Sequence, residues 1–149
     1  MREIKFRAWD IEDKTMIPSD YNDDHYIFHF THGGSPELLE ANWDEQPDGY
    51  HTKKALFLQY TGLTDKNGVE IYEGDIVECP DFYNYTDGST GTVKNAVIAY
   101  CEVTAIWWVE FEGDCREMSL WSYGDLTSDL EVVGNIHENP ELLGDNNEN

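Results

Sequence analysis

The sequence predicts a mainly β fold, a small barrel or sandwich built from many short strands. Apolar and polar residues alternate with a period of two through several short segments. Turn sequences that contain glycine separate these segments, and only two short segments carry the capping residues of a helix. At 149 residues the chain is expected to form one domain, residues 1–149.

The chain opens with a predicted hairpin. In residues 3–9, Ile4, Phe6 and Ala8 alternate with polar or larger side chains, so they share one face of a strand. A polar turn follows, and residues 15–17 form the expected return strand.

Residues 18–54 have a different composition, rich in Asp, Asn, Gly, Pro and His. Residues 25–30 are predicted to form a short strand. Ser35-Pro36-Glu37 indicates the start of a helix of one to two turns, with Ser as the N-cap and Pro at the first position. We interpret residues 18–54 as a variable insertion or a small subdomain.

The central stretch, QYTGLTDKNGVEIYEGDIV, follows a predicted strand at residues 55–60. Asn67-Gly68 predicts a hairpin turn, and Gly74 indicates a bend or bulge. The nearby carboxylates, Glu70, Glu73 and Asp75, do not have the spacing of a calcium loop or of a glycosidase pair. We therefore interpret this stretch as a turn and a bend that close the sheet.

The last third predicts more strands and one short helix. Residues 96–111 are expected to form one long bent strand or two strands, residues 116–123 a return strand, and residues 129–136 a last strand. Residues 139–143 predict a one-turn helix with its asparagine as cap and proline at the first position. Residues 144–149 are expected to be a flexible tail.

Charge is the strongest compositional feature. The chain has 31 acidic and 9 basic residues, for a net charge of −22. Residues 1–54 hold 12 acids and 6 bases, and residues 55–149 hold 19 acids and 3 bases, so the second part carries −16. Such a surface disfavours direct binding of nucleic acid or of an anionic membrane and favours a basic protein partner. The alternative is that the charge only maintains solubility.

The cysteines and the N-terminus indicate a reducing cytosol. The three cysteines have no CxxC spacing and are expected to be buried or half-buried rather than disulfide-bonded. The N-terminal residues lack the apolar segment of a signal peptide, and no apolar run is long enough to span a bilayer. No cofactor is expected.

Three stretches, REIKFRAWD, LFLQYTGLTDKNGVEIYEGDIV and EVVGNIHENPELL, resemble the YopX family of phage and prophage proteins in order and separation. The resemblance implies an SH3-like β-barrel with additional strands, here with an inserted N-terminal segment and a short C-terminal helix. It also implies a phage or prophage source, hence the cytosol of a host bacterium, and no enzymatic activity.

The leading hypothesis is a non-enzymatic accessory protein that binds a basic host protein. Its sharper form is an acidic mimic of nucleic acid that inhibits a host nucleic-acid-binding defence protein, such as a restriction or CRISPR nuclease. The candidate contacts, chosen by charge density alone, are Glu102, Glu110, Glu112, Asp114, Glu117, Asp125, Asp129 and Glu131.

Two alternatives belong to other functional classes. A homo-oligomeric structural or regulatory module would expose aromatic side chains around Trp107–Val109 or Trp121–Tyr123. A metal-dependent enzyme would bind zinc through the N-terminal imidazoles, with a nearby aspartate or His51 as a further ligand. The zinc ligands of that hypothesis are His25, His29 and His32.

Overall fold

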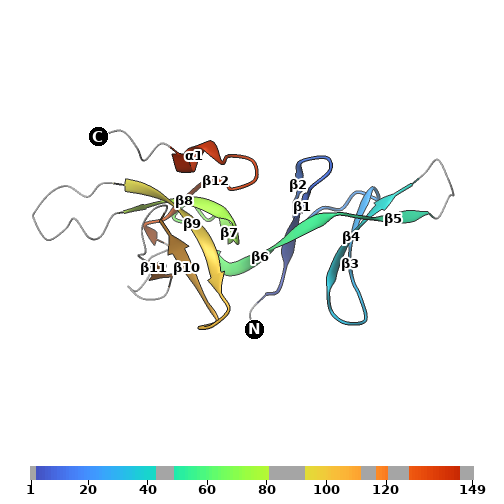
Figure 1. Ribbon diagram of the computed structural model, residues 1–149, viewed down its shortest axis with the longest axis horizontal. Helices are drawn as coiled ribbons and strands as arrows, with labels where there is room; N and C mark the ends of the chain where they lie inside the picture. Colours follow the sequence, from blue (N-terminus) through green and yellow to red (C-terminus); the bar gives the residue numbers. More distant parts are fainter. Residues whose placement is uncertain (1–2, 43–48, 81–92, 112–116, 121–127, 145–149) are drawn as a thin grey trace, which may run out of the picture. The chain divides into compact units, whose positions relative to one another are not determined.

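The computed structural model describes residues 3–42, 49–80, 93–111, 117–120 and 128–144. This part of the chain is mainly β, with one short helix near the C-terminus (Figure 1). Contacts divide the chain into two compact units. The N-terminal unit is Lys5–Gln59, and the C-terminal unit is Met1–Ile4 with Tyr60–Asn149. The expectation of one domain with an insertion at residues 18–54 stays a prediction.

The N-terminal unit is built from antiparallel strands. They are β1 (Phe6–Asp10), β2 (Thr15–Ile17), β3 (Tyr26–Phe30), β4 (Pro36–Ala41), β5 (Tyr50–Lys53) and the first part of β6 (Ala55–Thr64). β1 pairs with β2 and β6, and β4 pairs with β3 and β5. Buried Ala8, Ile17 and Leu38 form its core, with partly buried aromatic rings packed around them. Ala8 therefore faces inward, as the alternation of the first strand predicts.

The prediction of a helix that starts at Ser35-Pro36-Glu37 is wrong, because residues Pro36–Ala41 form β4. β4 is the middle strand of three, so both of its edges are used by ladders, and Leu38 is fully buried. An isolated helix of this length is unstable, whereas two ladders and a buried side chain stabilise a strand. Pro36 fits because it is the first residue of the strand.

The C-terminal unit contains a curled five-stranded antiparallel sheet in the order β11-β10-β9-β8-β12 (Figure 1). Its strands are β8 (Asp75–Pro80), β9 (Val93–Cys101), β10 (Ile106–Glu110), β11 (Glu117–Ser119) and β12 (Glu131–Asn135), and β7 (Glu70–Tyr72) pairs with the end of β6. Nine buried side chains, Trp107 and Leu130 among them, form one core cluster. The predicted fold class, a small mainly β barrel-like fold with a short C-terminal helix, is confirmed.

The predicted turns of the central stretch are also confirmed. Gly68 has a φ of 80° and donates its N–H to the carbonyl of Asp65 at 3.0 Å. Gly74 has a φ of 78° in the turn between β7 and β8, and its N–H donates to the carbonyl of Ile98 at 2.8 Å. Both angles are in the region that favours glycine. The ladder register shifts at two places: in β12 between Val132 and Gly134, and in β6 between Tyr60 and Thr64.

The helix α1 (Glu141–Gly144) ends the described chain, as predicted. The backbone carbonyl of Leu142 accepts a hydrogen bond from Asn95 Nδ2 of β9 at 2.9 Å. Just before the helix, Asn139 lies so close to Gly134 that a Cβ at position 134 would be 2.6 Å from Asn139 Oδ1. Glycine is therefore required at position 134, because Asn139 leaves no space for a side chain. Most of the predicted flexible tail, residues 145–149, lies outside the described residues.

Candidate functional site

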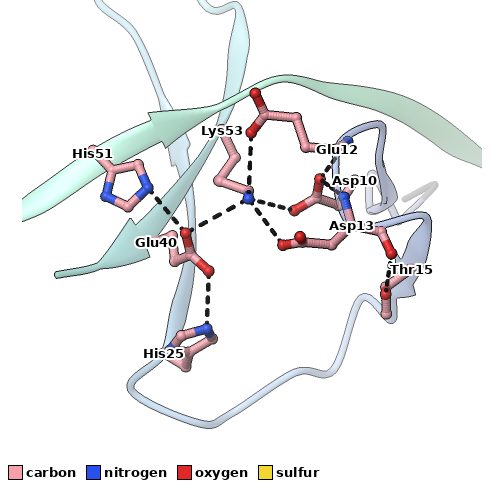
Figure 2. Close-up of polar contacts among 8 residues, drawn as sticks. All are labelled: Asp10, Glu12, Asp13, Thr15, His25, Glu40, His51 and Lys53. Atoms are coloured by element: carbon pink, nitrogen blue, oxygen red, sulfur yellow. Dashed lines mark hydrogen bonds and ion pairs between the residues drawn. The ribbon is translucent and has the colours of Figure 1, made fainter.

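Lys53, the last residue of β5, places its ammonium group among four carboxylates (Figure 2). Its Nζ lies 2.9 Å from Asp13 Oδ2, 3.3 Å from Asp10 Oδ2 and Glu12 Oε2, and 3.6 Å from Glu40 Oε2. We call these five residues the Lys53 cluster. The side chain of Lys53 is 7% exposed, and that of Asp10 is completely buried. One positive charge against four negative charges leaves three net negative charges.

Asp10, at the end of β1, organises the turn that carries two of these carboxylates. Its Oδ1 accepts hydrogen bonds from the backbone N–H groups of Glu12 at 2.9 Å and Asp13 at 3.0 Å. Burial acts to raise the pKa of Asp10, but these N–H donors and Lys53 outweigh it, so the pKa lies below its usual value. Asp10 is therefore a buried anion that needs its lysine.

The pKa of Lys53 is raised, first by its hydrogen bond to Asp13 and then by Asp10 and Glu12, in spite of burial. An amine held in its protonated form is not a nucleophile, because nucleophilic lysines have a lowered pKa. The Lys53 cluster therefore acts electrostatically. It fastens the turn between β1 and β2 to β4 and β5.

Two histidines extend the cluster through Glu40. His25 Nε2 lies 3.0 Å from Glu40 Oε1, and His51 Nε2 lies 2.9 Å from Glu40 Oε2 (Figure 2). The carboxylate of β4 thus contacts groups from the turn before β3 and from β5. Both imidazoles are about half exposed, at 43% and 51%, so the rim of the cluster reaches solvent.

The structure does not bring His25, His29 and His32 together as zinc ligands. His29 lies near a different carboxylate, Glu37, at 3.6 Å. His25 and His29 are four residues apart along an extended chain, which separates them by roughly 13 Å. No group of three His, Cys, Asp or Glu side chains that could hold a metal ion occurs within the described residues. The zinc hypothesis is not supported.

Asp65 joins the central stretch to the C-terminal stretch. Its Oδ1 accepts hydrogen bonds from the N–H groups of Asn67 at 2.8 Å and Val69 at 2.9 Å, and its Oδ2 accepts one from Val132 of β12 at 2.9 Å. Burial acts to raise the pKa of Asp65, but these three donors outweigh it and the pKa is lowered. The carboxylate stabilises the turn.

Two of the three carboxylates named from the sequence hold Tyr72. Asp75 Oδ2 accepts the N–H of Tyr72 at 2.7 Å, and Glu70 Oε2 accepts its hydroxyl at 2.8 Å. Asp75 is 1% exposed. These contacts agree with the interpretation of this stretch as a turn and a bend.

The candidate acidic contacts are spread over the C-terminal unit. Glu102 is exposed in the turn after β9, Glu110 is exposed at the end of β10, and Asp129 is exposed before β12. Glu131, in β12, forms an ion pair with Lys66. Glu117 lies in β11 as the ladder partner of Glu110. The remaining candidates, Glu112, Asp114 and Asp125, lie outside the described residues.

Glu78, which is not among the contacts predicted from charge density, is exposed on β8 and is the ladder partner of Glu131. The pKa of Lys66 is raised, chiefly by its hydrogen bond to Glu131 and also by the charge of Glu78. The signal was present in the sequence. In DIVEC, Glu78 alternates with Val77 and Cys79 and so lies on the opposite face of the strand from them.

Asp10 and Lys53 were also missed as a pair. Asp10 continues the alternation of Phe6 and Ala8, so the pattern places a carboxylate on the inward face of a strand. A buried carboxylate requires a cation or several hydrogen-bond donors. The pattern indicates that requirement but does not say which lysine meets it.

The aromatic and cysteine predictions divide between core and surface. Trp107 is 3% exposed in the core, Val109 is fully buried and Trp108 is half-buried, so Trp107–Val109 is not the exposed aromatic patch that the oligomer alternative requires. Cys79 is buried and Cys101 is half-buried, as expected for these cysteines. The other aromatic patch, Trp121–Tyr123, and the third cysteine, Cys115, lie outside the described residues.

Comparisons with known proteins agree with this architecture. The model of the YopX protein family matches residues 5–144. The crystal structure of protein EF1440 from Enterococcus faecalis is 30% identical, with a TM-score of 0.55, over 96% of this chain and 99% of that chain.

YopX from Bacillus subtilis is 19% identical, with a TM-score of 0.59 and the same coverage. A comparison with curated proteins found no match. No helix in the described part of the chain is long and apolar enough to cross a membrane. The family match spans most of the sequence, and the chain therefore belongs to the YopX protein family.

Proposed function

We propose that the chain acts without catalysis, by binding a basic protein through the acidic surface of its C-terminal unit. The specific form of the proposal is mimicry: the surface imitates nucleic acid and occupies the basic channel of a host defence nuclease. The charge supports it, because residues 55–149 carry 19 acids and only 3 bases. Such a field speeds encounters with a basic partner.

The observation that carries the proposal is that glutamates occupy directly opposite positions at two places in the sheet. Glu78 and Glu131 are direct ladder partners, and so are Glu110 and Glu117. Like charges directly opposite one another destabilise a sheet. The carboxylates of Glu78 and Glu131, kept in this costly arrangement, support a role for the surface in attracting a basic partner. Lys66 supplies one positive charge beside the first pair.

Burial distinguishes the acids of this surface from Asp10 of the Lys53 cluster. Glu102, Glu110 and Asp129 are exposed, whereas Asp10 is buried and already paired with Lys53. An exposed carboxylate is available to a partner, while a buried and paired one is committed to the fold. The proposed interface therefore excludes Asp10, although Glu12 and Asp13 of the same cluster are about half exposed.

The test is affinity capture from bacterial lysate with the whole chain as bait, at about 50 mM and about 500 mM salt. The wild type should retain a basic nucleic-acid-binding protein at low salt and release it at high salt. Added duplex DNA should compete. The double variant Glu78→Gln with Glu110→Gln should retain less.

A matched control removes the same charge elsewhere. Asp20→Asn with Asp24→Asn changes two exposed acids of the N-terminal unit and should leave capture unchanged. Capture that ignores salt, or that both double variants weaken equally, would contradict the proposed surface. Capture that DNA does not displace would remove mimicry while keeping protein binding.

A further inference from the structure

The outer edge of β3 is unpaired in the part of the chain that the structure describes, since β3 begins the order β3-β4-β5 (Figure 1). The strand reads YIFHF, without proline, glycine, acid, lysine or arginine. Natural proteins usually protect an edge with lysine, proline or a bulge, because a bare apolar edge pairs readily with another strand. Ile27 is 37% exposed and Phe30 is 52% exposed, so apolar surface accompanies this edge.

The ladder to β4 shows which backbone groups point outward. Next to the strand, Ala41 donates its N–H to the carbonyl of His25 at 2.8 Å, and Thr31 donates to the carbonyl of Ser35 at 2.9 Å. Hydrogen-bonded and non-bonded pairs alternate along an antiparallel ladder, so the odd-numbered residues of β3 bond to β4. The N–H and C=O groups directed away from β4 are those of Tyr26, Phe28 and Phe30.

We infer that β3 pairs antiparallel with β3 of a second copy of this chain, with Phe28 opposite Phe28 on a two-fold axis. In this register Tyr26 is opposite Phe30 on each side of the axis. Every outward-directed backbone group of the strand then has a partner, and each pair exchanges two hydrogen bonds. A shift by two residues would leave one of these residues unpaired on each strand.

Charge disfavours the pairing of two copies at most of the other edges. The chain carries −22, so two copies repel wherever carboxylates meet. The other edge strands contain charged residues, Lys53 in β5, Glu70 in β7, Glu117 in β11 and Glu131 in β12, except β2, which has only three residues. β3 offers the longest uncharged edge. Its self-pairing sets aromatic rings against each other on one face, and Ile27 against His29 on the other.

The register is self-complementary, as a two-fold interface requires, since residue i meets j and j meets i. The inference does not depend on the proposed function, because it uses the N-terminal unit and no acidic side chain. The response to salt distinguishes this inference from the proposed function. A dimer held by backbone bonds and apolar contact persists at high salt, whereas capture through the acidic surface is lost.

The test is sedimentation of the whole chain over a roughly hundredfold concentration range at high salt. The wild type should reach the mass of two chains. Ile27→Lys should weaken self-association by about tenfold or more, because lysine protects an edge. The added positive charge reduces net repulsion, so charge alone would have the opposite effect.

Thr52→Lys is the matched control, since Thr52 is exposed on β5, at the other edge of the same sheet. It should dimerise like the wild type. Circular dichroism checks that both variants fold, and amide exchange adds an independent measurement. The amides of Phe28 and Phe30 should become protected as the concentration rises. A wild type that stays monomeric, or Ile27→Lys that dimerises like Thr52→Lys, would overturn the inference.

Discussion

Asp10 in the N-terminal unit and Asp65 in the C-terminal unit are both buried carboxylates with a lowered pKa, yet their charges are compensated differently. Asp10 accepts two backbone N–H groups and faces the ammonium of Lys53. Asp65 accepts three backbone N–H groups, the last from β12. The first is an ion-pair network and the second is a backbone clamp.

The apolar cores of the two units also differ, in the number of buried side chains. Among the described residues, the core cluster of the C-terminal unit has nine buried side chains, and that of the N-terminal unit has three. A unit that buries little apolar surface gains less stability from its core. The N-terminal unit therefore depends more on its polar network. This comparison predicts that breaking the Lys53 cluster costs more than breaking the Asp65 clamp.

The largest expected effect follows from Lys53→Met. It leaves Asp10 buried and without its cation, which should lower the free energy of unfolding by about 4 kcal/mol. Urea unfolding followed by circular dichroism measures the change. Lys66→Met, at an exposed pair, should change little. Adding Asp10→Asn to Lys53→Met should recover part of the loss, and equal unfolding midpoints for the two lysine variants would contradict the comparison.

A smaller effect is expected for Asp65→Ala. The N–H groups in the exposed turn can bond to water, but that of Val132 loses its acceptor inside the sheet, so the loss should be about 2 kcal/mol. Asp129→Ala, which removes an exposed carboxylate, should stay within about 0.5 kcal/mol of the wild type. The same urea measurement decides the order. A larger loss for Asp65→Ala than for Lys53→Met would reverse it.

The smallest effect is the response to acid. The folded-state pKa values of Asp10 and Asp65 lie below the ordinary 3.8, so their stabilisation is present above that pH and is lost as pH falls through the lowered values. Both carboxylates should contribute to the loss of stability in acid. Unfolding free energies measured from pH 6 down to about pH 2 test it. The free energy of unfolding of Asp65→Ala should fall less steeply in acid than that of the wild type. Identical slopes would contradict a contribution of Asp65 to the acid response.

The stabilisation by Lys53 depends on pH in the opposite direction. Its pKa is raised in the fold, so its stabilisation is complete below the ordinary 10.5 and is lost as pH rises through the higher value. The Lys53 cluster therefore keeps its full stabilisation across neutral pH. Acid removes it through Asp10, and alkali removes it through Lys53.

Local chemistry was enough to predict much of the fold. The hairpin at Asn67-Gly68, the bend at Gly74 and the return strand at residues 15–17 all follow from turn residues and alternation over a few positions. The short C-terminal helix was predicted in the same way. Such features depend on residues that are adjacent in the sequence, so the sequence alone is sufficient to predict them.

The candidate surface was predicted only in part. Exposed Glu110 and Glu102 follow from charge density, but Glu78 was missed, because its significance depends on β12 lying beside β8. Ladder register is a long-range property that composition does not contain. The opposed glutamates could therefore be recognised only once the strands were paired.

By itself, the sequence determined the acidic character of the chain, its family, its β class and most strand positions, because these reside in composition and in local periodicity. Only the tertiary structure decided that residues 36–41 are a strand and that Lys53 meets Asp13, 40 positions away. Both outcomes depend on partners distant in the sequence. The energy of a ladder or a buried ion pair exists only after the chain has brought those partners together.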